Sequence, residues 1–110
     1  MFESPFIPEV SAEELRAKYA AKQTFTLLDV REPSEHELCR LPGSKLIPLA
    51  DLPRRFGELR PSEEIIVVCR SGRRSAQAVR FLKEKGFAKS CNLAGGLLAW
   101  AGRVDPSMRP

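Results

Sequence analysis

The sequence lacks the features that mark exported, membrane-spanning and metal-bound small proteins. Its 110 residues include three cysteines and one histidine, with no CxxC pair, which argues against a disulfide framework and a tetrahedral zinc site. No apolar run approaches the ~18 residues that a membrane helix needs. The amino terminus carries glutamates and prolines in place of the basic and apolar stretches of a signal peptide. We therefore expect a soluble, cytoplasmic protein with reduced thiols, no metal, no cofactor and no membrane partner.

The sequence also lacks a broad excess of charge. The formal net charge is +4, yet five basic residues lie between Cys69 and Lys83, where there is no acidic residue, and the rest is close to neutral. A short arginine-rich segment suits a pocket for a small anion or an acidic protein tail, whereas nucleic acid needs a wider basic face. We predict no nucleic-acid partner.

The remaining composition is that of one globular domain. With 43% hydrophobic and 29% charged residues, the chain can bury a core without disulfides or metals. We predict a domain over residues 1–104 and a flexible tail over residues 105–110, because the tail shows no apolar periodicity.

Apolar patterning predicts strands that alternate with helices. The segments 24–30 and 64–69 are rich in β-branched and apolar residues without alternation, which is typical of strands buried on both faces of a parallel sheet. Helical signals include a capping box at Ser11 and Glu14, and an amphipathic pattern over 74–85 that stops at Gly86. The other predicted elements are short helices over 32–38, 51–59 (capped by Asp51) and 97–101, and brief strands over 45–48 and 90–93.

This alternation predicts the fold class. Strands that alternate with helices form an α/β domain, here a doubly wound, mostly parallel sheet of four or five strands with helices on both faces.

The segment after the most apolar strand carries the residues that favour chemistry. Cys69 ends that strand, and functional groups of open parallel sheets gather outside the carboxyl ends of the strands. Backbone N–H groups of a tight turn, a helix amino terminus and nearby arginines would favour the reactive thiolate. The alternative is that Cys69 is a small buried core residue. The candidate substrate loop that follows it consists of Arg70, Ser71, Gly72, Arg73, Arg74 and Ser75.

Three motifs in order resemble a single rhodanese domain of the sulfurtransferase family. They are LLDVREPSEHE with LPGSKLIPL (27–49), VVCRSGRRSA (67–76) and NLAGGLLAW (92–100). The resemblance implies that Cys69 carries sulfane sulfur as a persulfide, which the loop N–H groups stabilise. It also implies that Asp29 and Arg31 support the loop, while the two residues by themselves fit an ordinary ion pair at a strand end equally well.

The resemblance also implies partners. They are a small anionic sulfur donor such as thiosulfate, and an acceptor that is a sulfur-carrier protein or a thioredoxin-type thiol. The loop and the tail DPSMRP (105–110) are similar to the rhodanese domain of adenylyltransferase/sulfurtransferase proteins of molybdopterin and thiamin biosynthesis. In those proteins the persulfide attacks an acyl-adenylate on a carrier protein.

Two other functions fit the same resemblance. One is a non-catalytic rhodanese module that binds or regulates through an acidic protein segment. The other is a phosphatase or arsenate reductase, whose longer loop has histidine before the cysteine and arginine after five intervening residues. Here Val68 precedes Cys69 and Arg74 comes one position too early, while an intact cysteine loop favours the sulfurtransferase.

Four residues outside the loop also receive a prediction. Cys39 is a candidate second thiol for resolving a Cys69 persulfide, and its role stays open. Cys91 is predicted to pack in the core, and Trp100 to pack the last helix onto the sheet. For His36 a solvated or capping role is favoured over a catalytic one.

Overall fold

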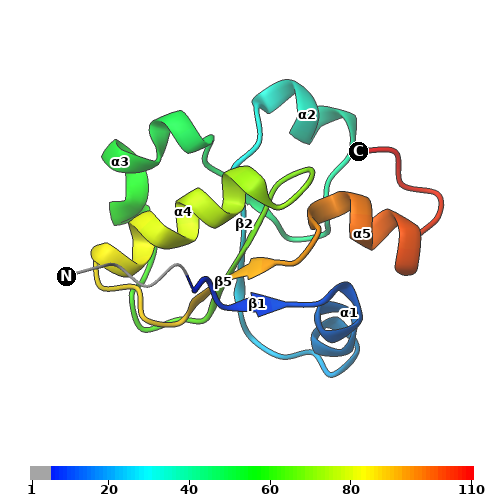
Figure 1. Cartoon of the computed structure of the whole chain (residues 1–110), viewed down its shortest axis with the longest axis horizontal. Coiled ribbons are helices and arrows are strands. Elements are labelled where there is room, and N and C mark those ends of the chain that lie inside the picture. The colour runs from blue at the N-terminus through cyan, green and yellow to red at the C-terminus, as the bar shows by residue number, and fades with distance from the viewer. Residues whose placement is uncertain (1–5) are drawn as a thin grey trace.

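The fold is a five-stranded parallel sheet, in a computed structural model that describes residues 6–110. Helices lie on both faces of the sheet (Figure 1). This confirms the predicted fold class. The first five residues of the predicted domain lie outside the described range. The strands lie in the order β1-β5-β4-β2-β3, with bounds β1 Glu9–Val10, β2 Thr26–Asp29, β3 Lys45–Leu46, β4 Ile65–Val68 and β5 Ser90–Leu93.

The helices connect the strands in the alternating pattern that the sequence predicts. None of those within residues 6–110 is both long enough and apolar enough to cross a membrane. Their bounds are α1 Ala12–Ala20, α2 Pro33–Leu38, α3 Leu52–Arg55, α4 Arg73–Glu84 and α5 Gly96–Arg103, with 3₁₀ turns η1 Leu49–Asp51 and η2 Phe56–Glu58 around α3.

The core consists of two apolar layers, one on each face of the sheet. Side chains of consecutive strand residues point to opposite faces, so Ile65 and Val67 of β4 join the layer beneath α3 and α4. Ile66 and Val68 join the layer beneath α1 and α5, which includes Trp100. An apolar run without alternation therefore belongs to a strand covered on both sides, and the predicted packing of Trp100 is confirmed.

The predicted helix cap is correct at the first helix and wrong at the third. The Ser11–Glu14 capping box is present, since the Ser11 hydroxyl accepts from the Glu14 amide and the Glu14 carboxylate accepts from the Ser11 amide. The prediction that Asp51 caps a helix is wrong. Its side chain makes no capping bond, and its carboxylate pairs with Arg54 at 3.1 Å after the chain has already turned in η1. The short strand β1 was not predicted.

The strand order determines where a site can form. From β2 the chain moves outward to β3, and from β4 it moves to β5 on the other side, so the winding direction reverses between β2 and β4. Ligands of open α/β sheets bind outside the carboxyl ends of the strands at such a reversal. Here Val30–Arg31 and Cys69 follow those two strand ends.

Candidate functional site

Cys69 lies between the end of β4 and a tight turn, and backbone N–H groups that follow it point at its sulfur atom. The Gly72 amide donates to Sγ at 3.1 Å and the Ser75 amide at 3.3 Å. Gly72 makes the turn possible, because its φ of 99° lies in the left-handed region that other residues avoid. Helix α4 starts at the next residue, so its positive end also faces the sulfur. This arrangement stabilises negative charge on a sulfur atom whose residue is fully buried.

The amino-terminal turn of helix α5 holds this loop through backbone hydrogen bonds. The Leu97 amide donates to the Cys69 carbonyl at 2.9 Å, and the Leu98 amide donates to the Arg70 carbonyl at 3.0 Å. A Cβ on Gly96 would come within 2.5 Å of the Arg70 carbonyl oxygen. Gly96 therefore lets the amino terminus of α5 approach the loop backbone directly, whereas a Cβ on Gly95 would meet Ala99 of α5 itself.

The loop arginines have different surroundings. Arg70 donates through Nε to the Pro110 carbonyl at 3.3 Å. Arg74 forms a bidentate pair with Glu35 of α2, with N–O distances of 2.7 and 3.0 Å. Arg73 is exposed and has no side-chain partner among residues 6–110. Of the three arginines proposed to attract an anion, Arg73 is therefore the freest and Arg74 joins the loop to α2.

The Arg74–Glu35 pair also changes how both groups titrate. The hydrogen bond from Arg74 lowers the pKa of Glu35 to about 2, against a partial opposing effect of burial. The same bond raises the pKa of Arg74. The pair is thus charged on both sides at any pH near neutrality.

Asp29 and Arg31 form a buried ion pair at the end of β2. Both side chains are 1% exposed, and the Arg31 guanidinium reaches the Asp29 carboxylate at 2.8 Å. Arg31 also donates to the Cys39 carbonyl at 2.6 Å, which ties down the carboxyl end of α2. Burial alone would raise the pKa of Asp29, but the bonds from Arg31 and His36 outweigh it and the pKa is lowered. A supporting role for the pair remains a proposal.

His36 has a more specific place than the sequence indicated. Its Nδ1 lies 3.0 Å from an Asp29 carboxylate oxygen, so the ring extends the buried ion pair to α2. The solvated or capping role predicted for it does not describe this contact. The signal was present in the sequence, since a histidine on a short helix directly after Asp-x-Arg lies within reach of that carboxylate.

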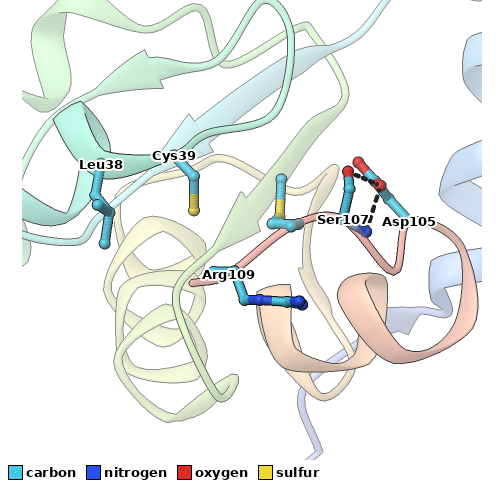
Figure 2. Close-up of a pocket in the computed structure, with 6 residues that line it drawn as sticks. Leu38, Cys39, Asp105, Ser107 and Arg109 are labelled. Atoms are coloured by element: carbon cyan, nitrogen blue, oxygen red, sulfur yellow. Dashed lines mark hydrogen bonds between the residues drawn. The ribbon is translucent and has the colours of Figure 1, made fainter.

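A cavity of about 370 Å³ lies beside the carboxyl end of α2. Figure 2 shows Leu38 and Cys39 on one side, and Asp105, Ser107 and Arg109 from the segment after α5 on the other. That segment passes close to the loop that follows Cys69, since Pro110 accepts the hydrogen bond from Arg70. All three cysteines are free thiols. Cys91 is buried in the core as predicted, and burial raises its pKa to about 11.

Sequence reasoning missed Asn92, which contacts the loop from β5. Its side-chain NH₂ group donates to the Gly72 carbonyl at 3.1 Å, and its side-chain oxygen lies 2.5 Å from the Ser75 hydroxyl. The signal was a polar residue in a short strand that is buried throughout, since a buried side-chain amide needs hydrogen-bond partners. No group of three or more potential metal ligands occurs in the part of the chain that the structure describes.

Comparison with known proteins assigns this architecture to a family. The model of the rhodanese-like domain matches residues 11–103. The chain belongs to the rhodanese-like domain family. It is 32% identical to a sulfurtransferase of Allochromatium vinosum, over 94% of this chain and 97% of that protein. A crystal structure of a rhodanese-like domain protein from Staphylococcus aureus superposes with a TM-score of 0.81 at 30% identity, covering 86% of this chain and 91% of the other.

Longer relatives contain this rhodanese-like domain as one part. The chain is 39% identical to the Bacillus subtilis protein YrkF, covering 90% of this chain and 54% of YrkF. It is 34% identical to the adenylyltransferase and sulfurtransferase MOCS3 of Arabidopsis thaliana, covering 94% of this chain and 26% of that protein. The predicted similarity to adenylyltransferase/sulfurtransferase proteins is therefore confirmed. These relatives support sulfur transfer as the general activity of the chain.

Proposed function

We propose that the protein is a sulfurtransferase that carries sulfane sulfur as a persulfide on Cys69. The convergence of the Gly72 and Ser75 amides on Cys69 Sγ carries this proposal. Two donors directed at Sγ stabilise the thiolate that attacks the sulfur donor and that forms again when the persulfide gives up its outer sulfur. The position of the loop at the winding reversal of the sheet supports it further.

The proposed reaction has two displacement steps. In the first, the Cys69 thiolate attacks the outer sulfur of thiosulfate, the S–S bond of the donor breaks, and sulfite leaves with the bonding electrons. In the second, a nucleophilic acceptor attacks the outer sulfur of the persulfide, and Cys69 leaves as a thiolate. With a carrier protein activated as an acyl-adenylate, the outer sulfur of the persulfide instead attacks the carboxyl carbon, the C–O bond to AMP breaks and AMP leaves. The acyl disulfide formed on Cys69 is then cleaved by a thiol reductant, which releases the carrier as a thiocarboxylate and Cys69 as a thiolate. Neither displacement needs an external oxidant, a metal or a cofactor.

Intact-mass measurement tests the first step. After incubation with thiosulfate, mercaptopyruvate or a cysteine-desulfurase mixture, the protein should gain the mass of one sulfur atom. Cys69→Ala should abolish this gain, whereas Cys39→Ser and Cys91→Ser should retain it. No gain with any donor would refute the proposal and favour the binding module, whose acidic partner would be sought instead.

Arg73 is proposed to attract the anionic donor, because it is the loop arginine without a partner among residues 6–110. Arg73→Ala should raise KM for thiosulfate and weaken its dependence on salt, with a smaller effect on an uncharged donor. Arg80→Ala is the matched control, since it removes an exposed arginine from the same helix outside the loop. Arg74→Ala should impair charged and uncharged donors alike, because it releases the loop from Glu35.

A further inference from the structure

Cys69, Ser75 and Asn92 form a short chain of polar side chains that are buried in the structure. Their exposed fractions are 0%, 0% and 2%. The Cys69 Sγ atom lies 3.2 Å from the Ser75 Oγ atom, which in turn lies 2.5 Å from the Asn92 Oδ1 atom. Because these side chains are buried, their hydrogen-bond partners in the structure are mainly one another and the loop backbone.

The direction of these hydrogen bonds follows from counting donors and acceptors. The Asn92 amide nitrogen must face Gly72, because only the NH₂ group can donate to the Gly72 carbonyl. The Asn92 oxygen therefore faces Ser75, and since it carries no proton, the Ser75 hydroxyl donates to it. A hydroxyl has one proton to donate. Ser75 Oγ thus presents a lone pair to Cys69, and the Cys69 thiol is the donor in their contact.

Ionisation of Cys69 disturbs this arrangement. A thiolate accepts from the Gly72 and Ser75 amides but has no proton for the Ser75 oxygen. The single Ser75 proton must then either stay with Asn92 or turn to the sulfur and leave the buried Asn92 oxygen unpaired. Arg74, which is paired with Glu35, is one charged side chain that interacts electrostatically with Cys69, and this interaction does not depend on which partner the Ser75 proton takes.

We propose that Asn92 is a positioning residue that acts through Ser75 and restrains ionisation of Cys69 in the unloaded protein. By holding the Ser75 proton, Asn92 makes the hydroxyl an acceptor that favours the thiol, against the loop amides that favour the thiolate. This role rests on the proposed function, in which Cys69 must ionise to take up sulfur. Asn92 thereby makes the reactivity of Cys69 depend on β5, the strand beside β4.

The pH profile of alkylation tests this role without any sulfur donor. In Asn92→Leu the Ser75 hydroxyl is free to donate to the sulfur, so iodoacetamide should modify Cys69 about fivefold faster at low pH, the effect of one net hydrogen bond. Peptide mass mapping separates Cys69 from the other two cysteines. In the Ser75→Ala background the same Asn92 substitution should give no acceleration, because the intermediary hydroxyl is gone. An unchanged or slower rate in Asn92→Leu, or an equal acceleration without Ser75, would overturn the proposal.

A second measurement does not depend on whether Asn92→Leu folds. The infrared S–H stretch of Cys69, assigned by difference from Cys69→Ser, should have a lowered frequency in the wild type because the thiol donates to Ser75. In Ser75→Ala it should move to the frequency of a thiol without an acceptor. Equal frequencies in the two proteins would contradict the proposed direction of the bond. Failure of the sulfur-loading assay would refute the proposed function and leave both of these results standing.

Discussion

Replacement of Gly96 by alanine tests how the loop after Cys69 is held in place. Gly96 has a φ of 63°, and a Cβ there would lie 2.5 Å from the Arg70 carbonyl oxygen and 2.6 Å from the Cys69 carbonyl oxygen. These atoms belong to the loop backbone and cannot rotate away as a side chain would. The loop and the amino terminus of α5 must therefore separate.

The expected loss of stability has two parts. A left-handed alanine costs about 1–2 kcal/mol relative to glycine. Separation also weakens the bonds from the Leu97 and Leu98 amides to the loop carbonyls, each worth about 1 kcal/mol net. Gly96→Ala should therefore destabilise the protein by about 3 kcal/mol, a large part of the typical stability of a domain, which is about 5–15 kcal/mol.

Two other glycines separate these contributions in urea denaturation. Gly86 has a φ of 94° with nothing within 4 Å of an added Cβ, so Gly86→Ala should lose only about 1–2 kcal/mol. Gly102 lies within α5 with similar free space and no positive φ, so Gly102→Ala should gain about 0.5–1 kcal/mol. If Gly96→Ala destabilises no more than Gly86→Ala, then close approach of α5 does not support the loop. Gly96→Ala should also slow sulfur loading, which Gly102→Ala should leave unchanged.

Three further predictions concern buried and paired groups. Asp29→Asn leaves the Arg31 charge buried without its anion, so it should destabilise by about 3–5 kcal/mol in urea, and a loss below about 1 kcal/mol would contradict the buried pair. Glu35 has a folded pKa of about 2, below its ordinary 4.5, so its pair with Arg74 stabilises above pH 4.5 and loses this effect as pH falls toward 2. Because both side chains are about one-third exposed, the stability difference from Glu35→Gln should be about 0.5–1 kcal/mol at pH 6 and shrink across that range; a constant difference would argue against it. Cys91, whose pKa burial raises to about 11, holds little thiolate at pH 8 and should resist iodoacetamide until the protein unfolds, and rapid labelling of the native protein would contradict the raised pKa.

The sequence by itself determined the elements whose signals are local. The apolar run of β4 and the Ser11–Glu14 capping box depend on neighbours within a few residues, and both occur as predicted. The candidate loop was found for the same reason, because a strand end, a glycine turn and a helix start are adjacent in the chain. The family resemblance then depended on motifs that are themselves contiguous.

Tertiary structure alone decided which distant groups meet. β1 has two residues and is a strand only because it pairs with β5, so no pattern of its own marks it. Arg74 and Glu35 are 39 positions apart, and Ser75 and Asn92 are 17 apart. Their contacts exist because the strand order places β5 beside β4, and because α2 packs near the start of α4. Periodicity and capping report the environment of one segment, whereas the partner of a buried polar group depends on how the segments pack together.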